Sequence, residues 1–275
     1  MPLSWNAVSR VEALESIRGR ARLAVVLGSG LSGLPSAFET VLSIPYAALP
    51  GFRPTSVEGH EGRLALSRIG GSDVLLFAGR FHAYEGLGPD ECGAPVSLAA
   101  SLGCERVVLT QAAGSLARRL RPGSWLVPSD IVTLPTASPI ARCGGPARSA
   151  RAERPGARAA LISRALRLEL LEAARAAGIA AAEGSILWTA GPAYETAAEA
   201  RAAALIGAQA ATMSGLPELV AARSLGLEAA LASWITNYAT HLARSPLDHA
   251  EVCRLGAEGT ASLAAIVTRL AGAAP

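Results

Sequence analysis

The chain has 275 residues, of which 51% are apolar, and a formal net charge of +3. This length fits one large α/β domain or two small ones, and the apolar fraction is enough for a sizeable core. No uninterrupted apolar run approaches the roughly 20 residues that a membrane helix needs. Residues 1–20 carry charges where a signal peptide would be apolar, so we expect a cytoplasmic protein with no membrane partner.

Candidate strands and helices alternate along the whole chain. Apolar runs of strand length are followed by helical patterns that end at glycines such as Gly103, Gly178 and Gly226. The predicted strands cover residues 24–27, 63–69, 73–78, 106–110, 126–133, 180–189, 210–213 and 227–236, and the predicted helices cover residues 9–20, 90–102, 158–177, 195–206, 216–225 and 248–272. This alternation predicts one α/β domain over residues 1–275, with a mixed, mainly parallel central sheet flanked by helices.

One segment does not fit this alternation. Residues 135–156 are rich in Pro, Gly and Arg and contain no aromatic residue. The segment is too long for an ordinary connection, so we expect a functional or mobile loop.

Cysteine and arginine add little to a functional assignment. The four cysteines are widely spaced and form no CxxC pair, so we expect neither a metal site nor a disulfide framework. Every basic residue other than histidine is arginine, and three of these arginines lie in the short run 118–121. No aromatic residues interleave with that run, which favours a solvated turn over a nucleic-acid partner.

The first strand ends in a glycine-rich segment, residues 28–33, that matches GxGxxG. The pattern alone is a weak sign of dinucleotide binding, and no convincing acidic residue follows at the spacing that would hold a ribose. The two serines in the segment offer hydroxyl groups beside the backbone N–H groups. A phosphate cradle of this kind does not require a dinucleotide.

A second polar loop, residues 79–86, follows the predicted strand 73–78. It holds an arginine, a histidine, a tyrosine and a glutamate between two glycines. Ligands bind at the carboxyl ends of the strands in such sheets, and the planar arginine fork suits phosphate or carboxylate. The alternative is a surface loop in which Arg80 and Glu85 pair with each other.

Polar or small residues also follow four other apolar strands, at 110–114, 191–196, 212–215 and 236–237. Each has a structural explanation: Glu195 could be the first-turn acid of its helix, and Asn237 could hold a turn. Because all of them follow apolar strands, a shared cleft explains the whole set better.

In chain order these segments resemble the motifs of the trimeric purine nucleoside phosphorylases, a family that includes the methylthioadenosine phosphorylases. The resemblance covers about residues 20–255 and rests on residues 27–31, 59–64, 79–86, 112–114, 191–196, 213–218, 235–237 and 249–252. It implies the nucleoside phosphorylase fold, a homotrimer, and cleavage of a purine nucleoside by inorganic phosphate without a cofactor.

The resemblance also implies roles for individual residues. Phosphate binding is implied for Ser29, His60, Arg80, His82, Ser214 and the backbone N–H of Ala112. Ribose binding is implied for Tyr84, Met213 and His249, and base binding for Tyr194, Glu195 and Asn237. Asn237, Glu195 and His82 are the catalytic candidates, and Asn237 favours inosine- or guanosine-like substrates because methylthioadenosine phosphorylases typically carry aspartate there.

Four positions depart from the family pattern. In residues 110–115, Gln111 replaces the Asn that is usual in the family, and Ser115 replaces the second of two glycines. Gly215 replaces a Thr, and Tyr194 replaces a Phe. A serine at position 115 would be strained if that backbone needs a positive φ. The loop 135–156 lacks the aromatic residue that, in the family, a neighbouring subunit places over the ribose.

Three alternatives therefore stay open beside a 6-oxopurine nucleoside phosphorylase. The departures could mark a modified or 5′-methylthio nucleoside as the substrate. The protein could also be a non-catalytic nucleoside-binding relative, although such a protein needs no phosphate pocket. A nicotinamide-dependent oxidoreductase rests only on the glycine pattern.

Overall fold

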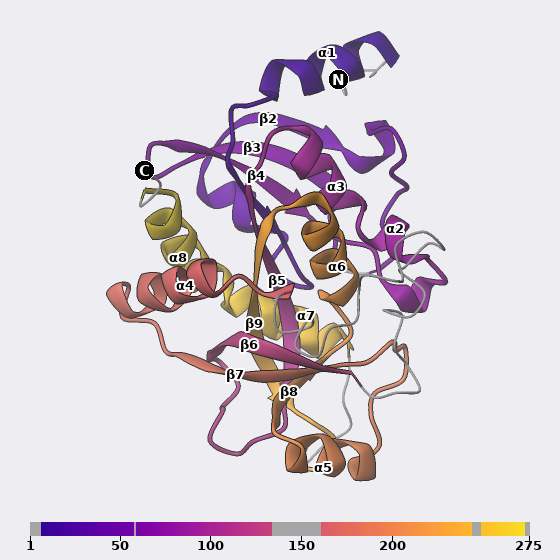
Figure 1. The fold of residues 1–275 in the computed structure, drawn as a ribbon, viewed down its shortest axis with the longest axis vertical. Helices are drawn as coiled ribbons and strands as arrows, with labels where there is room; N and C mark the ends of the chain where they lie inside the picture. The colour runs from indigo at the N-terminus through magenta and orange to yellow at the C-terminus, as the bar shows by residue number, and fades with distance from the viewer. Residues whose placement is uncertain (1–6, 58, 134–160, 244–248, 273–275) are drawn as a thin grey trace.

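The computed structural model describes residues 7–57, 59–133, 161–243 and 249–272 (Figure 1). The predicted loop 135–156 lies outside the described residues, as do the first three residues of the helix predicted at 158–177. The side chain of His249 also lies outside them, although the backbone of helix α7 begins at this residue.

Helices and strands alternate over most of the described chain. The helices are α1 (Ala7–Ile17), α2 (Pro89–Cys92), α3 (Ala94–Ser101), α4 (Arg164–Ala176), α5 (Ala197–Leu205), α6 (Leu216–Leu225), α7 (His249–Glu258) and α8 (Thr260–Gly272). The strands are β1 (Leu23–Val26), β2 (Glu39–Pro45), β3 (Arg63–Ile69), β4 (Ser72–Ala78), β5 (Arg106–Ser115), β6 (Trp125–Thr133), β7 (Ala181–Trp188), β8 (Ala208–Thr212) and β9 (Glu228–Tyr238).

All of these strands belong to one mixed sheet in the order β2-β3-β4-β1-β5-β8-β7-β6-β9. Strand β1 runs parallel to β4 and β5, and β5 also pairs in parallel with β9. Strand β9, the last in this order, also pairs with β5, so the five strands β5, β8, β7, β6 and β9 are hydrogen-bonded in a closed ring. The remaining ladders include antiparallel pairs, β2–β3–β4 among them, which confirms the predicted mixed sheet.

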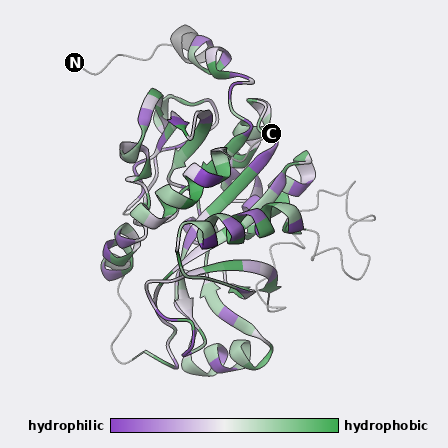
Figure 2. Ribbon diagram, turned by 90° about the vertical axis from the view of Figure 1, so that its left-hand side faces the viewer, coloured by the Kyte–Doolittle hydropathy of each residue, from purple (hydrophilic) through white to green (hydrophobic). Residues whose placement is uncertain are grey.

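Helices cover both sides of the sheet. One buried cluster joins β1, β4 and β5 to α3 and α6, and a second joins the opposite side chains of the same strands to α4 and α8. Figure 2 shows the hydrophobic colour concentrated on the central strands, whereas the helices alternate between hydrophobic and hydrophilic residues. The helices therefore bury their apolar faces against a sheet that is covered on both sides.

The structure differs from the sequence prediction at three elements. Strand β2 was not predicted because it lies at the sheet edge and most of its residues are exposed or half-buried, which removes the alternating pattern. The predicted helix 90–102 is broken at Gly93, where a Cβ atom would lie 2.8 Å from Ala221. The predicted helix 248–272 is broken at Gly259, which packs against the Trp234 ring and leaves no room for a side chain.

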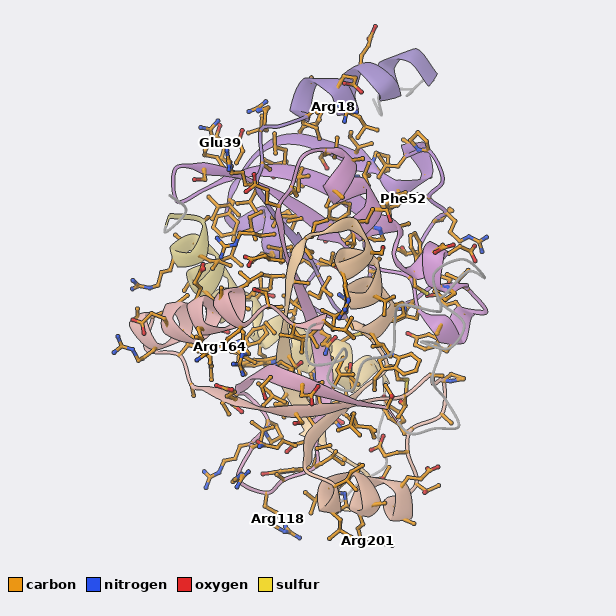
Figure 3. All side chains as sticks on the ribbon, viewed as in Figure 1. Arg18, Glu39, Phe52, Arg118, Arg164 and Arg201 are labelled. Carbon is orange, nitrogen blue, oxygen red and sulfur yellow. The ribbon has the colours of Figure 1, made fainter. Side chains whose placement is uncertain are left out.

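The arginine run at 118–121 lies on the surface. Arg118, Arg119 and Arg121 are exposed, whereas Leu120 is buried. Figure 3 shows Arg118 projecting outward at the end of the molecule where α5 lies. This geometry is that of a solvated turn anchored by one leucine.

Candidate active site

A pocket opens at the carboxyl ends of β5, β8 and β9. It is bordered by the loops that follow β1, β4 and β7 and by helix α7. It is lined by Ser29, His82, Tyr84, Ala112, Ala113, Gly114, Thr189, Tyr194, Glu195, Ala211, Thr212, Met213, Ser214, Thr236, Asn237 and Val252. Nine of the predicted site residues are in this lining; His60 and Arg80 are not, and the side chain of His249 is outside the described residues.

His82 lies in the middle of a stack of three rings. Its imidazole is 5.2 Å from the ring of His60 and 4.6 Å from the ring of Tyr84, measured between centroids. His60 thereby backs the pocket through His82 without lining it. Gly79 permits this arrangement, since its φ is +129° and a Cβ atom there would lie 3.0 Å from the Cβ of His60.

Glu85 orients His82 and does not pair with Arg80. Its Oε1 atom lies 2.9 Å from His82 Nδ1 and accepts a bond from the His82 backbone N–H at 2.8 Å. The carboxylate therefore favours a proton on Nδ1, which leaves Nε2 as the ring nitrogen available to a ligand.

Burial lowers the pKa of His82, although the hydrogen bond with Glu85 acts in the opposite direction. Burial acts to raise the pKa of Glu85, but its hydrogen bonds with His82 and Ser56 hold that pKa below its usual value. Near neutral pH the pair is therefore a neutral imidazole beside a carboxylate. In this state Nε2 accepts a hydrogen bond, and a hydrogen phosphate ion can donate one.

Arg80 is buried directly behind the pocket. Its side chain is fully enclosed, and its Nε atom lies 3.1 Å from Glu218 Oε1 on helix α6. Burial lowers the pKa of His82 and raises that of Tyr84, and the positive charge of Arg80 acts to lower both. Arg80 Nη1 is buried and has no hydrogen-bond partner among the described residues.

The glycine-rich segment 28–33 is explained by packing. A Cβ atom at Gly28 would lie 2.6 Å from Gln111 Cα, and one at Gly30, where φ is +79°, would lie 2.3 Å from the Cys253 carbonyl oxygen. A dinucleotide fingerprint would open a long helix here. This segment instead leads into one 3₁₀ turn, Leu34–Ala37, and then β2, which argues against the oxidoreductase alternative.

Thr212 connects two of the predicted phosphate-binding positions. Its hydroxyl donates to the Ala112 carbonyl oxygen at 3.1 Å and accepts from the Ser214 backbone N–H at 3.3 Å. The end of β8 is thereby held against β5, and Ser214 leads directly into helix α6. An anion beside Ser214 would also meet the positive end of that helix dipole.

Gln111 and Gly215 are complementary in shape. The fully buried Gln111 side chain donates from Nε2 to Ser233 Oγ at 3.1 Å. Its Oε1 atom would lie only 2.5 Å from a Cβ atom at Gly215, where φ is +93°. The longer amide at 111 therefore occupies space that a side chain at 215 would need, so these two departures from the family pattern belong together.

Ser115 carries no backbone strain. It lies within β5, and the described residues with positive φ are all glycines. Its buried hydroxyl donates to the Ala117 carbonyl oxygen at 2.8 Å and accepts from the Ala117 N–H. Strain was expected only if residue 115 needed a positive φ, and it does not.

The predicted sugar-binding residues Tyr84 and Met213 converge on Gly191. A Cβ atom at Gly191 would lie 2.6 Å from Met213 Sδ and 2.9 Å from Tyr84 Cδ1, so a glycine is needed where the three meet. Burial raises the pKa of the Tyr84 phenol, which keeps its hydroxyl protonated and able to donate.

Glu195 is not needed to cap helix α5. Thr196 is the N-cap, and Glu199 closes the capping box by accepting from the Thr196 backbone N–H at 2.8 Å. Glu195 precedes this cap and lines the pocket, where it is 9% exposed and accepts from the Thr240 N–H at 3.4 Å. The predicted alternative, a first-turn acid, is therefore wrong.

Asn237 lies at the end of β9 with its amide held in one orientation. The Thr236 hydroxyl donates to its Oδ1 atom at 2.7 Å, and its Nδ2 atom donates to the Tyr238 carbonyl oxygen at 3.0 Å. Gly114 leaves room for this amide, since a Cβ atom there would lie 3.2 Å from Nδ2. One N–H of the amide remains to donate to a ligand.

Sequence reasoning gave several members of the site no individual role. Thr189 and Val252 line the pocket, Thr212 and Thr236 orient their neighbours, and Glu218 pairs with Arg80. Thr212 and Thr236 lie in the strand-end segments 212–215 and 236–237, which the sequence placed in a shared cleft without giving either threonine a role, and Thr189 ends a predicted strand in the same way. Nothing in the chain links position 218 to position 80, because their contact forms only when α6 packs against α3 and β9.

Comparisons with known proteins identify the family of this chain. The profile of the phosphorylase superfamily matches residues 22–271. Purine nucleoside phosphorylase 1 of Geobacillus stearothermophilus is 36% identical over 231 residues, which cover 84% of this chain and 83% of that protein. The chain belongs to the phosphorylase superfamily and, within it, to the purine nucleoside phosphorylases, which confirms the predicted family.

Solved structures give the same result for the fold. The Schistosoma mansoni purine nucleoside phosphorylase in complex with inosine has a TM-score of 0.82 at 28% identity, covering 98% of this chain and 96% of that chain. The complex of a Schistosoma mansoni purine nucleoside phosphorylase with adenosine has a TM-score of 0.81 at 27% identity, covering 99% of each chain. The predicted fold class is confirmed.

Proposed function

We propose that the protein cleaves purine nucleosides with inorganic phosphate, releasing the free base and a (deoxy)ribose 1-phosphate. The observation that carries the proposal is the single pocket lining shared by Ser29, His82 and Ser214 at one end and by Glu195 and Asn237 at the other. The first group suits a tetrahedral anion, and the second suits the edge of a heterocyclic base. No cofactor is required by this chemistry.

Phosphate would occupy the end of the pocket near Ser29 and Ser214. Two hydroxyls and the Ala112 N–H would donate to it, and the guanidinium of Arg80 would donate to it through Nη1, which has no partner among the described residues. His82 Nε2 would hold the phosphate proton and so orient the ion, with His60 supporting the imidazole from the other side. One phosphate oxygen would then attack the anomeric carbon as the glycosidic bond breaks.

The base end would stabilise the leaving group. Charge builds on the purine as the bond breaks, and the free Asn237 N–H would donate to N7 more strongly in the transition state than in the ground state. Tyr194 would stack on the base. Tyr84, Met213 and His249 would hold the sugar, as the family resemblance implies.

Glu195 favours 6-oxopurines, so we propose inosine- or guanosine-like substrates. A carboxylate accepts from the N1–H and the 2-amino group of such bases, whereas N1 of adenine is itself an acceptor and would face the carboxylate unpaired. A site built around such a hydrogen bond rejects the wrong base by roughly 100-fold or more.

We also propose a homotrimer that works with purine nucleoside and phosphate alone, without nucleic acid or membrane. Among the described residues, no helix has both the length and the apolar character that a membrane crossing requires.

A phosphorolysis assay tests the function. Inosine, guanosine, adenosine and methylthioadenosine are each incubated with and without phosphate, and release of the base is followed. We expect phosphate-dependent release of hypoxanthine and guanine. Preference for a 6-amino nucleoside would overturn the assignment of Asn237 and Glu195, and no turnover of any purine nucleoside would overturn the enzyme itself.

A further inference from the structure

Glu218 is the most deeply buried acid among the described residues, and sequence reasoning gave it no role. It lies in the first turn of α6 with 1% of its surface exposed. Its Oε2 atom accepts from the Gly215 backbone N–H at 3.1 Å, next to Ser214. Its Oε1 atom lies 3.1 Å from Arg80 Nε. One carboxylate thus contacts two separate parts of the proposed phosphate pocket.

A helix cap alone does not explain this residue. Glu199 occupies the equivalent position of α5 and caps that helix from an exposed side chain. Burial of a carboxylate and a guanidinium is costly, and an apolar pair of similar volume would usually stabilise a fold at least as well. The buried pair behind the pocket therefore indicates a role in ligand binding.

The geometry of the pair leaves part of the guanidinium unused. The carboxylate approaches Arg80 Nε within ion-pair distance but without hydrogen-bond geometry, and Arg80 Nη2 lies 3.5 Å from the Val26 carbonyl oxygen. Nη1 is buried without a hydrogen-bond partner among the described residues. An unsatisfied buried donor of this kind is costly unless a ligand supplies the acceptor.

We propose that Glu218 is a positioning residue for phosphate. It holds Arg80 by the Nε edge and the Ser214–Gly215 turn by its backbone N–H, so that the remaining N–H groups of the guanidinium meet the anion. The inference rests on the proposed function only in taking phosphate as the anion.

Substitution of Glu218 by glutamine separates positioning from folding. The amide keeps an oxygen that can accept from the Gly215 N–H, but it lacks the negative charge that pairs with Arg80. We expect the KM for phosphate and the Kd for inorganic phosphate, measured by calorimetry, to rise about 10- to 100-fold. The KM for the nucleoside and kcat at saturating phosphate should change less than about threefold, because the base end is untouched.

Two further variants make the result decisive. Glu199→Gln removes the equivalent acid of α5 and should leave phosphate binding unchanged. Glu218→Asp keeps the negative charge on a shorter side chain, so its Kd for phosphate should lie between those of the wild type and Glu218→Gln. This variant still tests the proposal if Glu218→Gln does not fold. The negative charge of Glu218 also acts to raise the pKa of His82, so the imidazole of Glu218→Gln should titrate at lower pH.

The two proposals fail in different ways. Unchanged phosphate Kd in folded Glu218→Gln and Glu218→Asp, with only a lower melting temperature, would overturn the role of Glu218 and leave the phosphorylase intact. A wild-type protein that binds phosphate but cleaves no purine nucleoside would overturn the proposed function, and the Kd comparison would still test Glu218. Absence of phosphate binding by the wild type would overturn both.

Discussion

The phosphate end and the base end of the pocket are built differently. Arg80 and His82 are 1% and 4% exposed and are held by Glu218 and Glu85, whereas Tyr194 at the base end is 39% exposed. Charges that are withdrawn from water interact strongly and tolerate little change. Glu195 and Asn237 at the base end are also held by hydrogen bonds, so the difference lies in the two buried charge pairs, and it predicts that substitutions at the phosphate end should be the most costly.

Arg80→Met should have the largest effect. It removes the buried cation from the phosphate end, and we expect kcat/KM for phosphate to fall about 100- to 1,000-fold. Glu218 would be left buried and unpaired, at a cost of about 3–5 kcal/mol in the free energy of unfolding. Steady-state kinetics and denaturant unfolding measure the two effects.

Arg22→Met is the matched control for that substitution. Arg22 pairs with Glu105 on the surface, where the two side chains are 72% and 61% exposed. Such a pair contributes about 0–1 kcal/mol, and its loss should not change activity. Equal effects of the two substitutions would contradict the contrast between the buried site and the surface.

Glu195→Gln should affect the base end alone. We expect kcat/KM for inosine to fall roughly 10- to 100-fold, since an amide is a weaker acceptor for N1–H than a carboxylate. The KM for phosphate should stay within about threefold of the wild type, because Glu195 acts at the other end of the pocket. A parallel loss of phosphate affinity would show that the two ends are coupled and not independent.

Gly215→Ala tests the fit between Gln111 and Gly215. The new methyl group would meet Gln111 Oε1 at 2.5 Å at a positive φ, so we expect a loss of about 1–3 kcal/mol in the free energy of unfolding. Gly226→Ala is the control, since φ there is +78° and nothing lies within 4 Å. The Gln111→Asn/Gly215→Ala double variant should recover part of the loss; strict additivity would argue against a shared space.

Sequence patterns predicted what depends on neighbours along the chain and missed what depends on packing. Strand ends located the pocket because polar groups there are displayed at one edge of the sheet, and this placed Ser29, Glu195 and Asn237 together. The partner of Arg80 could not be predicted, because Glu218 reaches it only after α6 packs against α3 and β9. Edge strand β2 was not predicted for a related reason. Few of its residues are buried, so its sequence shows no clear alternation of apolar and polar residues.

The smallest effect concerns the proton of His82. Glu85→Gln removes the carboxylate that raises the pKa of His82, so this pKa, already lowered by burial, should fall further. A proton NMR titration of the imidazole measures the shift, with His82→Asn to assign the signal and the exposed Glu172→Gln as a control that should leave it unchanged.

The same change predicts how stability depends on pH. The unfolded chain takes up a proton on His82 near pH 6.5 while the folded chain does not, so stability falls as the pH drops below that value, and over a wider range in Glu85→Gln. The pKa of Glu85 is lower in the folded chain than its value of about 4.5 in the unfolded chain, which stabilises the fold at pH values above 4.5. This stabilisation is lost as the pH falls through the folded pKa, and Glu85→Gln lacks it at every pH. Identical unfolding curves for the two proteins at pH 5 would show that Glu85 contributes nothing to the charge state of the phosphate end.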